Sequence, residues 1–433
     1  MKKFILLVVI FIIATFFIIG NKQEQSKSKE ENTFSQKDEK RAIFISYIEL
    51  NNYIKGKNSK TSKKNIDFII ANMKNNNFNM AILHVRPFSD AIYNSKIFPI
   101  SDTILNNTGS VPDYDVLSYF IEKAHKKGIE VHAWVNPYRI SNDTNIKVIK
   151  KAHPAYKYIN TNNIKVIENK GIFYNPASTE VKNLIVKGIK EIVENYNIDG
   201  IHFDDYFYPD KTIDLENYQI YLAAGGTLSI DEYRLENTTS LIKDVYDIIK
   251  SINENVLFGI SPEGNIDNNY STNYIDTKKI LSTTGYVDYI MPQIYFGFEN
   301  EVKPFLKTLN EWNNLIKTNS IQLLPALAIY KSGQIDDYAK KGKEEWVNNT
   351  DIIKKQIIAS RNISKYNGFS LFRYDYLFNP DKFNSNLIGE IDNLLSIMNL
   401  KWVDQYYNKK LNTWFFYKNM LQYATFRGVV EYG

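Results

Sequence analysis

Asp199-Gly-Ile-His-Phe-Asp-Asp-Tyr-Phe-Tyr-Pro209 carries the strongest structural signal in this sequence. Apolar and aromatic residues lead into two adjacent carboxylates, Asp204 and Asp205, and more aromatic residues and a proline follow. The pattern predicts a buried strand that ends by presenting acids, and a helical pattern precedes it, so the strand belongs to a βα repeat. Active sites form at the carboxyl ends of such strands. The alternative is that both acids cap the next helix or pair with cations. We favour function, because adjacent charges at a strand end are costly unless they are used.

The same alternation of β-rich runs and helical periods continues on both sides of this stretch. Eight strands, each followed by a helix, predict an α/β fold, namely a (β/α)8 TIM barrel over residues 41–398. A doubly wound sheet is the alternative, but it usually has fewer strands and a glycine-rich phosphate loop, and no such loop motif follows any strand here. The expected strands lie at residues 42–46, 80–87, 129–137, 199–209, 256–262, 289–295, 322–330 and 368–374.

The composition is that of a globular protein and excludes several classes of function. Of 433 residues, 44% are hydrophobic and 23% charged, which allows a large core. The net charge of +5 is small for this length and gives no indication of nucleic-acid binding. The sequence has no cysteine, which excludes disulfides, thiolate chemistry and cysteine-ligated metals.

Both ends of the chain differ from the predicted barrel. Two lysines precede an apolar run over residues 4–19, so residues 1–20 are predicted to be a signal peptide or an uncleaved membrane anchor. Residues 21–40 are polar and charged, and we expect a disordered linker. Residues 399–433 are rich in aromatic residues and are expected to form an extension packed on the barrel. The barrel is therefore expected outside the cytoplasm, held at the membrane or secreted to the cell wall.

Residues just past the strand ends of a barrel lie at one edge, so they form a candidate site. This set is dominated by carboxylates, amides and aromatic rings, which suit a neutral polyhydroxyl substrate. We expect the catalytic acids among Asp204, Asp205 and Glu263. The expected substrate-binding residues are Arg86, Asp90, Trp134, Asn136, Tyr138, Tyr206, Asn265, Gln293, Tyr295, Lys331 and Tyr374.

Three histidines lie in consecutive predicted strands, at His84, His132 and His202. Each shares strand parity with a polar residue further along, such as Arg86 after His84, so each set is expected on one face, inside the barrel. A zinc site is conceivable, but the histidines lie in the middle of their strands and no H-x-H or H-E-x-x-H pattern occurs. We therefore favour a hydrogen-bonded interior layer that supports the acids, and we expect neither metal nor cofactor.

Five motifs resemble the "family 10 glycosyl hydrolase-like" proteins, and they occur in order along the predicted barrel. The resemblance implies a (β/α)8 glycosidase fold, export to the cell envelope and action on peptidoglycan glycan strands, notably those without stem peptides. It implies no secure catalytic assignment, and fold membership does not prove activity. The motifs are His84-Val-Arg-Pro-Phe-Ser-Asp90, His132-Ala-Trp-Val-Asn-Pro-Tyr-Arg139, the stretch from Asp199 to Pro209, Gly259-Ile-Ser-Pro-Glu-Gly-Asn265 and Asp288-Tyr-Ile-Met-Pro-Gln-Ile-Tyr295.

Two catalytic schemes fit these residues. In the first, Asp205 and Glu263 on neighbouring strands serve as the acid and the second carboxylate of a glycosidase. In the second, the substrate's 2-acetamido carbonyl is the nucleophile, one aspartate of the Asp204-Asp205 pair orients it and the other is the acid and base. That pair looks like the one in O-GlcNAcase-type β-N-acetylglucosaminidases. Adjacent strand residues point to opposite faces, so both acids reach the site only if the strand ends or bends there.

Two other classes of function remain open. One is a catalytically silent barrel that binds surface glycans. The other is a metal-dependent polysaccharide hydrolase or deacetylase that uses the histidines. Residues 210–229 are long for a βα loop and are predicted to form a wall or lid beside the site. The sequence does not reveal the oligomeric state.

Overall fold

The computed structural model describes residues 39–205 and 207–398. Its centre is a curled sheet of nine strands in the order β10-β9-β8-β7-β3-β2-β1-β12-β11, and every pairing between neighbours is parallel. This confirms an α/β fold. The strands of the sheet are β1 (Lys40–Ile45), β2 (Met80–Arg86), β3 (Glu130–Val135), β7 (Gly200–Phe203), β8 (Leu257–Ile260), β9 (Tyr289–Ile290), β10 (Gln322–Leu323), β11 (Ala326–Leu327) and β12 (Gly368–Leu371).

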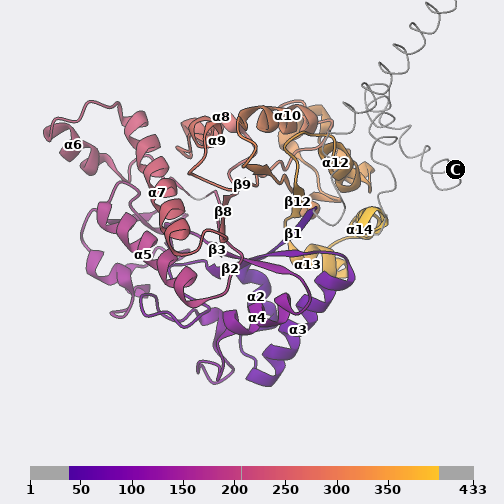
Figure 1. Cartoon of the computed structure of the whole chain (residues 1–433), viewed down its shortest axis with the longest axis horizontal. Coiled ribbons are helices and arrows are strands. Elements are labelled where there is room, and N and C mark those ends of the chain that lie inside the picture. The colour runs from indigo at the N-terminus through magenta and orange to yellow at the C-terminus, as the bar shows by residue number, and fades with distance from the viewer. Residues whose placement is uncertain (1–38, 206, 399–433) are drawn as a thin grey trace, which may run out of the picture. The chain divides into compact units, whose positions relative to one another are not determined.

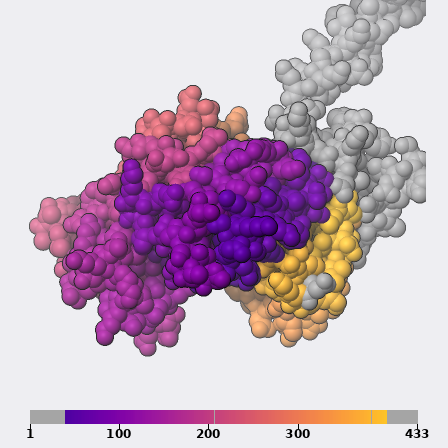
Figure 2. Space-filling view, turned by 90° about the horizontal axis from the view of Figure 1, so that it is seen from below, coloured from indigo at the N-terminus to yellow at the C-terminus, as the bar shows by residue number. Residues whose placement is uncertain are grey.

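The two outer strands of this sheet belong to one segment, which the sequence predicted as a single seventh strand. Strand β10 pairs with β9 and strand β11 pairs with β12, and only Leu324 and Pro325 separate them in sequence. Proline has no backbone N–H to donate, which accounts for the interruption. Leu323 also bridges to Tyr366, just before β12, so the segment is hydrogen-bonded along both sides. Figure 2 shows the earliest and latest described residues side by side, as the pairing of β1 with β12 requires.

Helices surround the strands in the picture of the whole chain (Figure 1). Each major helix follows a strand, as the repeat count predicted. The α-helices are α2 (Tyr47–Tyr53), α3 (Ser59–Asn75), α4 (Val116–His125), α5 (Thr179–Asn195), α6 (Leu215–Ala223), α7 (Ile230–Ile252), α8 (Ile266–Ser271), α9 (Thr277–Ser282), α10 (Phe305–Leu315), α11 (Glu345–Asn348), α12 (Ile352–Ser360), α13 (Tyr374–Phe378) and α14 (Ser385–Met398). Short 3-10 turns are η1 (Asp102–Ile104), η2 (Ile146–Val148), η3 (Pro154–Tyr158), η4 (Ile329–Lys331), η5 (Asp337–Gly342) and η6 (Pro380–Lys382).

Side-chain caps fix where several of these helices begin. Ser178 accepts a hydrogen bond from the Val181 amide at the start of α5, and Asp115 caps α4 in the same way. Capping boxes begin α2 and α7, where Ser46 pairs with Glu49 and Ser229 with Glu232. Helix α5 buries Val181, Ile185, Ile189 and Ile192 at helical spacing, so one apolar face of the helix is packed.

Two insertions rise from the carboxyl ends of neighbouring strands. The first follows β3 and forms a small antiparallel sheet of β4 (Arg139–Ser141), β5 (Ile164–Ile167) and β6 (Gly171–Tyr174). The second follows β7 and contains α6, which projects away from the sheet in Figure 1. They share a small core that contains Ile167, Phe173, Tyr208, Ile213, Leu235 and Tyr274.

A buried ion pair holds the second insertion to α7. Arg234 donates to both carboxylate oxygens of Asp214 at 2.9 Å, and the Tyr208 hydroxyl donates to the same carboxylate. Asp214 is 0% exposed and Arg234 3%, so removing either partner would leave an uncompensated buried charge. This pair fixes the base of the insertion to α7.

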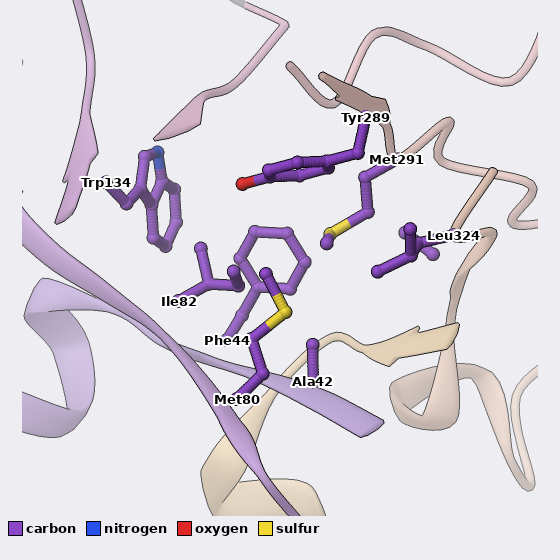
Figure 3. Packing of buried hydrophobic residues seen from close by; sticks show 9 residues of the cluster. Ala42, Phe44, Met80, Ile82, Trp134, Tyr289, Met291 and Leu324 are labelled. Atoms are coloured by element: carbon purple, nitrogen blue, oxygen red, sulfur yellow. The ribbon is translucent and has the colours of Figure 1, made fainter. Parts of the chain in front are cut away.

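Large side chains fill the interior of the curled sheet (Figure 3), and two glycines make room for them. The Tyr289 hydroxyl lies 3.0 Å from Nδ1 of both His132 and His202. An added Cβ at Gly200 would lie 2.2 Å from the His132 ring, and one at Gly259 would lie 2.1 Å from the Tyr289 ring. The interior polar layer therefore depends on the absence of side chains at these two strand positions.

The terminal predictions lie largely outside the described residues. The predicted signal peptide or anchor, residues 21–38 of the linker and the C-terminal extension from residue 399 all fall there. Strand β1 begins at Lys40, one residue before the predicted start of the barrel. Within residues 39–398, no helix has both the length and the apolar character needed to span a bilayer.

Gly259→Ala tests the packing of this layer. The new methyl group would overlap the buried Tyr289 ring, so the free energy of unfolding should fall by about 3 kcal/mol in denaturant titration. Gly225→Ala is the matched control, since Gly225 has φ +88° but nothing within 4 Å of an added Cβ. It should lose only about 1 kcal/mol through its backbone conformation. Equal losses at the two glycines would contradict the packing argument.

Candidate active site

Asp204 lies at the end of β7, where protein donors hold it. The Trp134 indole donates to its carboxylate at 3.1 Å, and the Asn136 amide donates at 3.2 and 3.3 Å. Asp204 is only 3% exposed. Trp134 and Asn136 come from the end of β3, the neighbour of β7, so two of the predicted site residues meet one of the predicted acids. These bonds fix the carboxylate and satisfy its buried oxygens.

Asp205, the residue after Asp204, is a carboxyl group whose pKa is raised. Strand β7 ends at Phe203 and the backbone bends at Asp205, which relieves the alternation that would send the two acids to opposite faces. Burial and then the neighbouring charge of Asp204 raise the pKa of Asp205 to about 7. Its own backbone amide and the Gln293 side chain lower this pKa, while the charge of Glu263 raises it. Asp205 is therefore partly protonated near neutral pH.

Glu263 and Gln293 come from the next two strand ends, and a parallel bridge joins their backbones. The Glu263 carboxylate accepts hydrogen bonds from Asn268 at 2.8 Å and Asn273 at 3.3 Å. Gln293 donates to the Ser261 carbonyl at 3.0 Å. Both side chains are half-buried, and both act on Asp205. Three predicted site residues thus meet at one edge of the sheet.

Tyr295 also lies beside the acids. Its pKa is raised well above its usual range by burial first, then by Tyr330 and by the charge of Asp205. Its ring is 5.8 Å from that of Tyr330 and 6.1 Å from that of Phe372. Tyr295 therefore lies at the edge where the sequence placed it. Its aromatic neighbours Tyr330 and Phe372 are not in the predicted substrate-binding set.

The three histidines form an interior layer, but none of them bonds an acid of the site. His202 lies 3.0 Å from the Ser261 hydroxyl and shares Tyr289 with His132. His84 stacks on Trp134 with ring centroids 3.6 Å apart. Burial, followed by the charges of Arg139 and His202, lowers the pKa of His84 well below its usual range, so this ring is neutral. Within the described residues, no group of three or more histidines and carboxylates is arranged to hold a metal ion.

The predicted position of Arg86 is wrong, because a β-bulge intervenes. His84 lies opposite Trp134, but Arg86 lies opposite Val135, so the register shifts between them and reverses the face of Arg86. Its guanidinium lies 4.3 Å from the Phe98 ring and against Gly188 of α5. Arg86 is 2% exposed, so it packs between sheet and helices rather than lining the site.

Tyr374 is also directed away from the acids. It is 0% exposed, and its hydroxyl accepts a hydrogen bond from Asn72 of α3 at 2.8 Å. Tyr138 is 1% exposed and its hydroxyl has no partner among the described residues. Both are packing residues in this structure, because the chain turns out of the sheet before each of them.

Three other predicted residues, Asp90, Asn265 and Lys331, have different surroundings. Asp90 accepts from the Phe88 amide, and burial raises its pKa. Asn265 caps α8 by accepting from the Asp267 amide. Lys331 pairs with Asp336 at 2.8 Å. Tyr206 lies outside the described residues.

Several aromatic residues near the site are absent from the predicted substrate-binding set. Tyr47 and Phe88 follow the first two strands, and their rings are 4.9 Å apart, with Tyr47 also 5.8 Å from His84. Tyr330 and Phe372 follow β11 and β12. Their places just past strand ends were the available signal, but an aromatic residue there is more often a packing residue.

The raised pKa of Asp205 predicts a pH-dependent cost to folding. An unfolded aspartate has a pKa near 4, so the folded state binds one proton more than the unfolded state between about pH 4 and 7. The contribution of Asp205 to the free energy of unfolding is fully present below pH 4 and is lost as the pH rises through 7. Asp205→Asn should therefore gain stability relative to the parent between pH 5 and pH 8, as measured by denaturant titration.

Asp210→Asn is the control, and the opposite change in the free energy of unfolding is expected for it. Burial raises the pKa of Asp210, but hydrogen bonds from Thr212 outweigh it and the pKa is lowered overall. This substitution should cost stability at pH 8 rather than provide it. A constant stability difference between Asp205→Asn and the parent across this range would contradict the raised pKa.

Comparisons with known proteins agree with the resemblance seen in the motifs. A sequence model of the family described as "Glycosyl hydrolase-like 10" matches residues 39–348. Glycosyl hydrolase YngK of Bacillus subtilis (strain 168) is 30% identical over 385 residues, which cover 82% of this chain and 72% of that protein. Glycosyl hydrolase DigH of Escherichia coli (strain K12) is 32% identical over 328 residues, or 70% and 73% of the two chains.

A solved structure shares the fold at low sequence identity. The glycoside hydrolase domain of PgaB (BpsB) from Bordetella bronchiseptica superposes with a TM-score of 0.55 and 12% identity, over 84% of this chain and 99% of that domain. This likeness concerns the fold. The family match over residues 39–348 and the two relatives lead to one conclusion: the chain belongs to the glycosyl hydrolase-like 10 family.

Proposed function

We propose that this protein is a glycoside hydrolase that cleaves N-acetylated cell-wall glycan, namely peptidoglycan strands, by carboxylate acid/base catalysis. The observation that carries the proposal is Asp205, whose pKa of about 7 lets it donate a proton at neutral pH. Its place past β7 matches where catalytic groups lie in (β/α)8 barrels. We take the curled sheet as such a barrel, with a seventh strand divided into β10 and β11.

In the mechanism that the contacts favour, Asp205 is the general acid and Glu263 the second carboxylate. A glycosidase needs one carboxyl group to protonate the leaving oxygen and another to act as nucleophile or base. Asp205 and Glu263 are both half-buried, so both retain surface for a substrate, and Asn268 and Asn273 orient Glu263. Different surroundings thus support different roles for the two groups.

Asp204 acts as a positioning residue in this scheme. Its carboxylate accepts from Trp134 and Asn136 and is almost fully buried, which leaves little of it for a substrate amide. Its negative charge raises the pKa of Asp205 and so keeps the acid protonated. The substrate-assisted scheme needs Asp204 to contact the acetamido group, and these contacts therefore favour the two-carboxylate scheme.

Three observations support the choice of substrate and location. The relatives are named glycosyl hydrolases. The sequence begins with a predicted export signal, which would place the barrel where cell-wall glycan is found. Half-buried aromatic and amide side chains, Tyr295 and Gln293, lie beside the acids and suit the apolar faces and hydroxyls of a sugar.

Mass spectrometry of products from purified glycan strands, with and without stem peptides, tests this function. Asp205→Asn and Glu263→Gln should each reduce cleavage by at least about 100-fold, because each removes a proton-transfer or nucleophilic group. Asp247→Asn, on the outer helix α7 with a side chain 56% exposed, is the matched control and should cleave like the parent. Absence of cleavage by the parent protein on either strand type would refute the proposal.

The pH profile separates the two schemes. The parent's activity should fall as the pH rises above about 7, where Asp205 loses its proton. Asp204→Asn removes a negative charge, so the pKa of Asp205 falls and this limb should move to lower pH while cleavage remains measurable. Abolished cleavage in Asp204→Asn at every pH, with near-parental rates in Glu263→Gln and tight binding of a thiazoline inhibitor, would instead identify substrate assistance.

A further inference from the structure

A row of aromatic rings leads away from the acids along the carboxyl ends of three strands. Tyr295 follows β9, Tyr330 lies in η4 after β11, and Tyr376 lies in α13 after β12, with Phe383 just beyond η6. We call these four residues the aromatic track. Successive ring centroids lie 5.8 Å, 6.0 Å and 3.9 Å apart from Tyr295 to Phe383.

The track is continuous with the proposed catalytic edge. Its first ring, Tyr295, is close enough to Asp205 for that charge to affect its ionisation. Phe372 supports this end, with its ring 6.1 Å from those of Tyr295 and Tyr330 and 5.6 Å from Phe44 of the interior. The inner end is thus held by the core of the sheet.

The rings of the track keep part of their surface free. Tyr295, Tyr330 and Tyr376 are half-buried, and Phe383 is 37% exposed at the outer end. None of the three hydroxyls makes a hydrogen bond to another described residue. By contrast, the tyrosines of the α6 insertion use theirs internally: Tyr218 donates to Leu228, and Tyr221 accepts from two backbone amides.

Two cations beside the track, Lys331 and Arg373, are paired within the protein. Lys331 bonds Asp336 at 2.8 Å, and Arg373 pairs with Glu49, whose side chain is 0% exposed. The Arg373 guanidinium also lies 5.1 Å from the Tyr376 ring centroid, and Phe383 stacks on the same ring, so part of this ring is already covered. The track therefore offers a ligand the remaining aromatic surface and the free tyrosine hydroxyls. Such a surface suits the apolar C–H faces and the hydroxyls of sugar rings.

We propose that the aromatic track binds several consecutive N-acetylated sugars of a glycan chain on one side of the cleavage point. The proposal rests on the proposed function, because the track begins beside the proposed catalytic acid Asp205. It specifies that the substrate is a chain that extends over several sugars beyond the bond that is cut. Tyr376 and Phe383 lie beyond residues 39–348, so the outer half of the track lies outside the family match.

Calorimetric binding of β-1,4-linked N-acetylglucosamine oligosaccharides tests the track without requiring cleavage. All variants carry Asp205→Asn, so that no probe is consumed. In this background the hexasaccharide should bind more tightly than the disaccharide. Adding Phe383→Ala or Tyr376→Ala should weaken hexasaccharide binding by about tenfold, through loss of one stacking ring. Phe68→Ala is the matched control, since Phe68 is 51% exposed on α3 and lies outside the track.

Each outcome decides one question. Hexasaccharide binding that is no tighter than disaccharide binding, or that is unchanged in both track variants, overturns the proposal. A weakening by Phe68→Ala equal to that by Phe383→Ala overturns it as well. Length-dependent binding in a protein whose parent form cleaves no glycan would support the track and refute the proposed catalysis, so the two failures are distinguishable.

Discussion

The hydrogen bonds from Trp134 and Asn136 to Asp204 are the contacts on which the rest of the site depends. They hold a carboxylate in a place with 3% exposure, where an unpaired charge would be too costly to keep. The fixed charge then acts on Asp205 next to it. Trp134 in turn stacks on neutral His84, which ties this bond to the interior of the sheet. The chemistry of the edge and the packing below it are therefore coupled.

The sequence predicted the strands and the edge at which the acids meet, because both follow from periodicities that the backbone imposes. Parallel strands share a direction, so the residues after β7, β8 and β9 had to come together, and Asp205, Glu263 and Gln293 do. Periodicity could not predict where it would be interrupted. The bulge between His84 and Arg86 reverses one arginine, and no sequence pattern marked it. The prediction for Tyr374 failed for a similar reason. Helix α13 begins at that residue and directs its buried ring toward α3, away from the acids.

The insertion that follows β7 is anchored by a buried ion pair. Arg234 and Asp214 form a bidentate pair that is nearly inaccessible to solvent, and Tyr208, three residues after Asp205, donates to the same carboxylate. The pair links the segment after the acid to the long helix α7. Strain or movement in the insertion would therefore reach the acid through only three residues of chain. The buried pair specifies the position of that segment rather than adding stability for its own sake.

The pairing of β1 with β12 has a consequence for the order of folding. Lys40 lies opposite Gly368, so the first strand of the sheet finds its second neighbour only near the end of the described chain. During synthesis, one edge of β1 has no partner until almost every repeat has been made, and contacts this distant in sequence slow folding. The intermediate repeats can associate earlier, but the sheet cannot complete its hydrogen bonding before then. The chain thus stays incompletely folded for most of its synthesis, which is the state in which unpaired strand edges are exposed to chaperones and proteases.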